Sequence, residues 1–283
     1  MLEGRYLGCT RIGGQMKQGG KLKLDQLIKK FRLNDNWIDQ NQIDELLSFG
    51  SKVVPHLEKI LADVNSQRHR FDVKIPPKNP GWFVPLYSLY LLAHLGSEDS
   101  LDTVLEFLSQ KQETLDYWLH DFLNEDIWEV TYLLGGNQLE KLQEFVLNKE
   151  LDCFARLAVC TALIQTALNF QKKKRTVSRI FTELLKSENE DSEFIGLLVS
   201  ELMDLQDQVL KPLMLKALET NVVWSGIISS GEVNSGFKKK CTRRIVPLDL
   251  PQRVEHFKQY AYRSTTSSRT SRQEKRRILE ESL

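Results

Sequence analysis

The stretch VPLYSLYLLAHLGSEDSLDTVLEFL, residues 84–108, contains the pattern that decides the fold of this chain. Its first part is a nearly unbroken apolar run that ends at Gly96, and a short polar segment follows. Its second part has apolar residues at positions i, i+3, i+4 and i+7, the spacing that aligns side chains on one helical face: Leu101, Val104, Leu105 and Leu108. We therefore predict two helices joined by a tight turn, in which Gly96 adopts the left-handed conformation that commonly ends a helix. Ser97 is predicted to cap the second helix by accepting a backbone N–H bond.

The same spacing recurs four more times along the chain, with one mismatch at Gln143. The matching sets begin at residues 57, 139, 177 and 210, so that with residue 101 the successive separations are 44, 38, 38 and 33 residues. Each of the last four sets follows another apolar segment, and Gly135 and Gly136 mark a second junction like that at Gly96. One helical hairpin cannot bury its apolar face alone, so neighbouring hairpins stack and share a continuous core. The pattern predicts an all-α chain folded as an α-solenoid of about five helical hairpins.

The ends of the chain differ from its middle in composition. We predict three parts: a flexible, glycine-rich N-terminus (1–22), the solenoid (23–220) and a basic tail rich in Ser and Thr (221–283). From Lys238 to Leu283 there are 13 Lys and Arg against 5 Asp and Glu, a net charge of +8, whereas the preceding residues carry −7. Within this tail, Ser271 and Glu274 form a capping box that predicts a short terminal helix. The chain therefore has a mildly acidic body and a basic tail.

Several classes of protein do not fit this sequence. The longest apolar run has about 14 residues and contains Pro85, Ser88 and His94, whereas a membrane span needs about 20 apolar residues. The N-terminus has no apolar stretch typical of a secretory signal. The four cysteines form no CxxC pair, which argues against a zinc site or a redox motif and fits a reducing cytoplasm. We therefore expect a cytoplasmic protein without membrane contact, metal or cofactor.

One segment resembles a known repeat family. In LDCFARLAVCTAL, residues 151–163, five residues match the HEAT-repeat signature: Asp152, Arg156, Ala158, Ala162 and Leu163. The resemblance implies that Asp152 and Arg156 have a structural role, in a polar ladder between neighbouring units. Residues 116–169, and more weakly 25–220, are similar to an uncharacterised bacterial family of HEAT-like proteins known only as a domain of unknown function. Some of those relatives carry a cysteine-rich metal motif near the C-terminus. Here that region has only Cys241, so no zinc site is carried over.

The densest group of polar residues lies in DYWLHDFLNED, residues 116–126. Helical spacing would place three of them on one face and two on an adjacent face: Asp116, His120 and Asn124, then Asp121 and Glu125. Carboxylates and an imidazole suit a metal site or general acid–base chemistry. The favoured interpretation is a solvated helix junction, in which Asn124 or Asp126 caps the next helix. Metal sites need convergent ligands, which helical spacing alone does not demonstrate.

Apolar packing is the simpler interpretation of the remaining candidates. Cys153 and Cys160 lie on one face of an apolar helix and are expected to pack as small hydrophobes. Four tryptophans in apolar surroundings are expected to lie in the core or between repeats: Trp82, Trp118, Trp128 and Trp224.

The basic tail suggests a nucleic-acid-binding segment. Its candidate residues are Lys238, Lys239, Lys240, Arg243 and Arg244, followed by the aromatic residues Phe257, Tyr260 and Tyr262. Basic residues interleaved with aromatic rings are typical of proteins that bind single-stranded nucleic acid. The favoured alternative is a solubilising tail, or one that folds back on the acidic body.

We expect a protein-interaction scaffold that binds another protein on the concave face of the solenoid, because stacked helices present an extended surface. Two other functions remain open: nucleic-acid binding through the tail, and an enzyme of the HEAT-like bilin-lyase type, which shares the repeat. No catalytic residue can be assigned, so an enzyme is the less expected outcome.

Overall fold

The computed structural model describes residues 18–33, 38–66, 83–238 and 250–255. Within these residues every regular element is a helix, which confirms the prediction of an all-α chain. The chain begins with α1 (Gln18–Arg32) and α2 (Gln40–Leu47), which pack against each other. Residues 18–22, predicted to be flexible, therefore belong to a helix, and residues 1–17 lie outside the described part.

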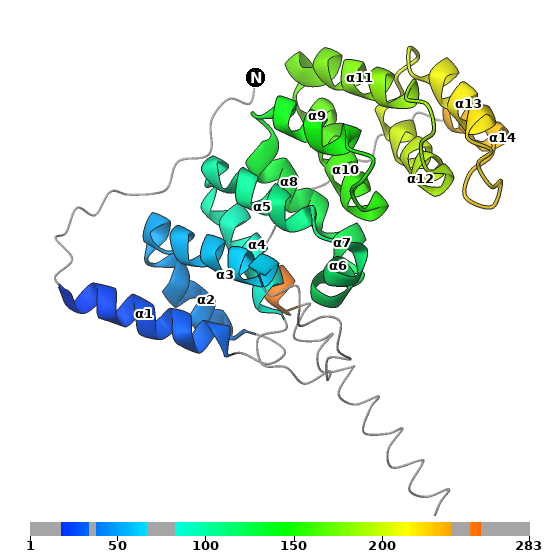
Figure 1. Cartoon of the computed structure of the whole chain (residues 1–283). Coiled ribbons are helices and arrows are strands. Elements are labelled where there is room, and N and C mark those ends of the chain that lie inside the picture. Colours follow the sequence, from blue (N-terminus) through cyan, green and yellow to red (C-terminus); the bar gives the residue numbers. More distant parts are fainter. Residues whose placement is uncertain (1–17, 34–37, 67–82, 239–249, 256–283) are drawn as a thin grey trace, which may run out of the picture.

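The following helices alternate between two layers (Figure 1). What we call the α4 layer contains α4 (Val84–Leu95), α8 (Ile127–Gly135), α10 (Cys153–Asn169) and α12 (Ser192–Leu202), which contact one another in that order. What we call the α5 layer contains α3 (Val54–Ser66), α5 (Leu101–Leu108), α9 (Leu139–Leu147), α11 (Gln171–Leu185) and α13 (Lys211–Thr220). Shorter helices complete the array: η1 (Gly50–Lys52), η3 (Glu98–Ser100), α6 (Gln112–Leu119), α7 (Phe122–Glu125), η4 (Met203–Leu205) and α14 (Ser230–Gly236). One continuous apolar core runs between the two layers.

The predicted helical faces are the faces that the structure buries. Each of the five sets of apolar residues lies on a helix of the α5 layer, and their side chains are buried except that of Leu213, which is half-buried. In α4, by contrast, every residue from Val84 to Ala93 is buried, because this helix packs against α3 on one side and α8 on another. The nearly unbroken apolar run of residues 84–95 is thus a helix enclosed by its neighbours.

The two glycine junctions have different physical causes. Gly96 ends α4 with φ 65°, so the predicted left-handed glycine is confirmed. At the second junction, Gly136 has φ −56°, which any residue can adopt. The glycine that is required there is Gly135, because a Cβ at this position would lie 2.8 Å from Leu142 Cδ2. The prediction that Ser97 caps the next helix is wrong. Its side chain caps no backbone N–H, and its hydroxyl instead accepts a hydrogen bond from the Ser100 hydroxyl at 3.0 Å.

Hydrogen bonds join the turns of successive units. Asn137 Nδ2 donates to Glu98 Oε1 at 2.7 Å, and Lys173 Nζ donates to Asn137 Oδ1 at 2.7 Å. Lys173 also donates to the carbonyl of Gly136 at 2.6 Å. The bonded side chains are 39 and 36 residues apart, close to the spacing at which the apolar sets recur. These three residues therefore link equivalent positions of three consecutive units.

The C-terminal part of the chain returns to the helical array. The helix α13 ends at Thr220, and α14 follows with a capping box formed by Ser229 and Glu232. Residues 250–255 form a helical turn, drawn in orange in Figure 1, that contacts α8 through Arg253. The predicted terminal helix at Ser271–Glu274 lies outside the described residues.

Candidate functional site

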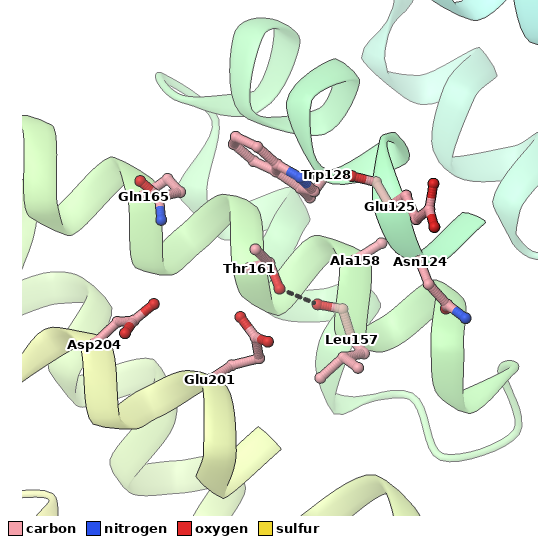
Figure 2. Close-up of a pocket in the computed structure, with 9 residues that line it drawn as sticks. All are labelled: Asn124, Glu125, Trp128, Leu157, Ala158, Thr161, Gln165, Glu201 and Asp204. Carbon is pink, nitrogen blue, oxygen red and sulfur yellow. Dashed lines mark hydrogen bonds between the residues drawn. The ribbon is translucent and has the colours of Figure 1, made fainter. Parts of the chain in front are cut away.

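A pocket of about 280 Å³ opens on the α4 layer (Figure 2), and its lining residues come from α7, α8, α10, α12 and η4. Its lining comprises Asn124, Glu125, Trp128, Leu157, Ala158, Thr161, Gln165, Glu201 and Asp204. Three of these residues are carboxylates that come from two different parts of the chain: Glu125 precedes α8, whereas Glu201 and Asp204 lie at the end of α12 and in η4. Such a lining suits a positively charged side chain that also offers apolar surface to the indole.

Local hydrogen bonds hold the walls of this pocket. The indole Nε1 of Trp128 donates to the carbonyl of Glu125 at 3.1 Å, and the hydroxyl of Thr161 donates to the carbonyl of Leu157 at 3.1 Å. Trp128 is only 6% exposed, which confirms its prediction as a packing residue. The polar groups of Trp128 and Thr161 are thus satisfied within the protein.

A second acidic group lies on the same segment and is buried. Asp126 directly precedes α8 and Glu129 lies in its first turn, and their side chains are 3% and 5% exposed. Arg253, from the turn at residues 250–255, pairs through Nη1 with Asp126 Oδ1 and through Nη2 with Glu129 Oε1. The hydroxyl of Tyr90 in α4 donates to Asp126 Oδ2 at 2.8 Å. We call Tyr90, Asp126 and Glu129 the arginine site.

The protonation equilibria of the arginine site reflect its burial. Burial raises the pKa of Glu129 more than Arg253 lowers it, so the net direction is upward. Burial, followed by the nearby charge of Asp126, raises the pKa of Tyr90 well above its usual value, so its hydroxyl remains a proton donor at neutral pH. For Arg253, burial alone would lower the pKa, but Asp126 and Glu129 raise it. A permanently charged guanidinium therefore balances the two carboxylates.

The predicted polar cluster does not form one site. The helix α6 ends at Leu119, and His120 has a φ of 47°, so Asp116, His120 and Asn124 do not share a helical face. All five predicted residues are exposed, and only Asn124 and Glu125 lie in the pocket. The alternative that Asp126 caps the next helix is also wrong, because its carboxylate makes no capping bond and accepts from Tyr90 and Arg253. In the described parts of the chain, no group of three or more His, Cys, Asp or Glu could hold a metal ion.

The two residues of the predicted ladder occupy different environments. Asp152 caps α10, since its carboxylate accepts from the backbone N–H groups of Phe154 and Ala155 at 3.0 and 2.9 Å. Arg156 is 2% exposed and forms a two-pronged ion pair with Glu190, with N–O distances of 3.1 and 3.2 Å. It also donates twice to the carbonyl of Val146. Arg156 thus joins α9 and α10 to the segment that precedes α12.

The cysteines and tryptophans are placed by packing, with one exception. Cys160 is buried, and Cys153 is half-buried; burial, reinforced by Asp152, raises the Cys153 pKa to about 12. Both thiols therefore pack as small apolar groups, as predicted. Trp118 is half-buried, Trp82 lies outside the described residues, and Trp224 is 73% exposed, so its assignment to the core is wrong.

The basic candidates of the tail lie mostly beyond what the structure describes. Lys238 is exposed after α14, whereas Lys239, Lys240, Arg243 and Arg244 fall outside the described residues. The alternative that the tail folds back on the acidic body is confirmed for residues 250–255 through Arg253.

Sequence reasoning missed a basic surface at the start of α11. Phe170 is 47% exposed, its ring stacks on Tyr132 with 6.5 Å between centroids, and Lys173 Nζ lies 4.8 Å from the Phe170 ring centre. Lys172 and Arg175 are exposed beside it. The run QKKKR at residues 171–175 is the sequence signal that could have revealed this surface.

None of the helices in the described residues combines the length and apolarity needed to cross a membrane.

Comparisons with known proteins add a family but no activity. Neither the curated proteins nor the solved structures contain a match to this chain. A family model described as "Protein of unknown function (DUF1186)" matches residues 22–257, well over half of the chain, and the protein therefore belongs to that family.

Proposed function

We propose that this protein is an interaction scaffold: a HEAT-like α-solenoid whose α4 layer forms the concave side and binds a basic segment of a partner protein. The observation that carries the proposal is the pocket between α8, α10 and η4, which Glu125, Glu201 and Asp204 line together with Trp128. A lysine or arginine side chain presents both a positive charge and an apolar stem, and so matches such a lining.

Repeated contacts between units support the solenoid part of the proposal. The turn residues Glu98, Asn137 and Lys173 bond from unit to unit, and Arg156 pairs with Glu190, 34 residues further along the chain. Contacts that recur at nearly the length of one unit are expected when each unit packs chiefly on its neighbours. Such an array leaves one long layer of helices available for a partner.

The charge of the α4 layer favours a protein over a nucleic acid as its partner. Phosphate contacts require clustered Lys and Arg, whereas the pocket lining contains three carboxylates: Glu125, Glu201 and Asp204. The half-buried and buried thiols, Cys153 and Cys160, are free, which supports our proposal of a cytoplasmic location.

The test compares two charge reversals that are matched in size. Three purified full-length chains serve as bait. The first is the wild type, and the second is the pocket variant, which carries Glu201→Lys and Asp204→Lys. The third is the control variant, which carries Glu106→Lys and Glu140→Lys on the exposed side of α5 and α9. Proteins captured from the native lysate are quantified with and without nuclease, and each candidate is then purified and titrated against the three chains. We expect one partner with a basic segment to lose at least about tenfold affinity, which is about 1.4 kcal/mol, on the pocket variant alone.

Two results would refute the scaffold proposal. Equal loss of affinity in both double variants would mean that general charge, rather than the pocket, determines binding. Capture that disappears with nuclease would instead support nucleic-acid binding, for which the exposed Phe170 and Lys172 of the basic surface are the first residues to substitute.

A further inference from the structure

The turn at residues 250–255 contacts the array as a bound ligand would. Its residues Leu250 and Val254 lie one helical turn apart and are 1% and 5% exposed, while Pro251 and Gln252 are exposed. Between the two apolar side chains, Arg253 reaches the arginine site and pairs with Asp126 and Glu129. The turn therefore places an arginine and two apolar residues on one helical face, and this face contacts the start of α8.

The receptor half of this contact belongs to the array and needs a cation. Asp126 and Glu129 are nearly inaccessible, and two carboxylates buried side by side are unfavourable unless a positive charge accompanies them. Tyr90 already donates to Asp126 and so orients that carboxylate toward Arg253. Any arginine delivered on a similar helical turn would satisfy the same geometry, because the guanidinium fork can bind both acids at once.

The intramolecular ligand is short and its attachment is modest. Two buried apolar side chains and the ion pairs of Arg253 with Asp126 and Glu129 are among the contacts that offset the conformational entropy of ordering the turn at 250–255. The side chain of its arginine remains 23% exposed.

The arginine site and the pocket are adjacent along one segment. Glu125 and Trp128 line the pocket, whereas Asp126 and Glu129, each the next residue in the chain, hold Arg253. Because successive residues of a helix point in different directions, a partner segment that meets both sites has to pass around the start of α8. This step rests on the proposed scaffold function.

We propose that Tyr90, Asp126 and Glu129 form a recognition site for an arginine on an apolar helical turn, and that residues 250–255 occupy this site within the same chain and compete with the partner. The chain then exists in a self-bound state and a partner-bound state. The partner is a protein whose segment carries arginine next to apolar residues three or four positions away.

The test uses the full-length chain and a synthetic peptide. Labelled LDLPQRVEHF, the chain's residues 248–257, is titrated by fluorescence anisotropy against wild-type protein and the Arg253→Ala variant, with an Arg-to-Ala peptide as the matched probe. If the site is self-occupied about 90% of the time, its release strengthens peptide binding about tenfold. We expect the Arg253→Ala protein to bind the wild-type peptide about tenfold more tightly than the wild-type protein does. The Arg-to-Ala peptide should not bind, and adding Glu129→Gln to the Arg253→Ala protein should abolish binding of the wild-type peptide.

A second variant guards against misfolding of the first. Val254→Asp breaks the apolar half of the contact, and hydrogen exchange of residues 250–255 and of α8 reports whether the turn has left its site. The proposal is overturned if both variants stay folded and bind the peptide no better than the wild type. This titration needs no partner, so its failure leaves the scaffold proposal standing. Partner affinity that does not rise in Arg253→Ala refutes the competition specifically.

Discussion

Replacing Arg156 by alanine should be the most damaging single substitution in the middle of the array. The guanidinium pairs with Glu190 through two N–O contacts of 3.1 and 3.2 Å, and both side chains are almost fully buried, at 2% and 1% exposure. It also donates at 2.9 and 2.8 Å to the carbonyl of Val146, which lies in the last turn of α9 and has no partner within that helix. The Phe194 ring centre lies 3.9 Å from the guanidinium carbon. One substitution therefore removes contacts to three elements.

The expected loss follows from what the substitution leaves behind. Glu190 would remain buried without its main counter-charge, and breaking a buried pair from one side costs about 3–5 kcal/mol. Lys149 could not replace the arginine, because its Nζ lies 4.0 Å from Glu190 and is half-exposed. Arg156→Lys should be intermediate, since an ammonium group keeps the charge but cannot span Glu190 and Val146 in one plane.

Equilibrium urea denaturation followed by circular dichroism measures these losses. A double-mutant cycle with Glu190→Ala should be non-additive by about 0.5–3 kcal/mol, because each single variant leaves one buried charge unpaired and the double variant leaves none. Lys149→Ala is the matched control, and its loss should stay below about 1 kcal/mol, as for exposed pairs. A loss below about 1 kcal/mol for Arg156→Ala, or strict additivity in the cycle, would refute the reasoning.

Two further outcomes are expected. Gly96→Ala should lower the free energy of unfolding by about 1–2 kcal/mol in thermal denaturation, because φ is 65° at this position while no atom crowds a Cβ. Gly96→Asn should lower it less, since asparagine adopts a positive φ more readily than alanine. Equal losses in the two variants would show that the backbone conformation is not the cause. For Asp63, burial alone would raise the pKa, but hydrogen bonds from Lys59 and Arg32 bring it below its ordinary 3.8. This carboxylate should therefore stabilise the fold above about pH 4, and the benefit should disappear as pH falls through the lowered pKa. The stability gap between wild type and Asp63→Asn should accordingly close between pH 6 and pH 3, and a constant gap would contradict the assignment.

The fold class could be predicted because apolar burial imposes a helical period on the sequence. Each set that begins at residue 57, 101, 139, 177 or 210 occupies one face of a helix in the α5 layer. The start of α5 was mispredicted because a tertiary contact competes with the local one. The Ser100 hydroxyl donates to Glu58 of α3 at 2.7 Å and lies 3.0 Å from the Ser97 hydroxyl, so the chain forms a 3-10 turn before the α-helix begins at Leu101.

The candidate sites were beyond local reasoning for two physical reasons. The shared face of Asp116, His120 and Asn124 assumed one continuous helix, but His120 adopts a positive φ without a glycine or proline to signal it. The arginine site depends on contacts between residues 124 positions apart, Arg253 and Glu129, and no local pattern encodes such a distance. Only the opposite charges of the body and the tail indicated that the two would meet.

The docked turn bears on where the folded unit ends. The family match extends to residue 257, so it includes residues 250–255 although these follow α14 only after a further stretch of chain. Because each unit of a helical array packs chiefly on its neighbours, polar residues on the α4 layer can change without disturbing the stack. Asp126 and Glu129 are an exception, since their burial is unfavourable unless an arginine accompanies them. The turn that supplies this arginine is therefore part of the same structural unit as α8.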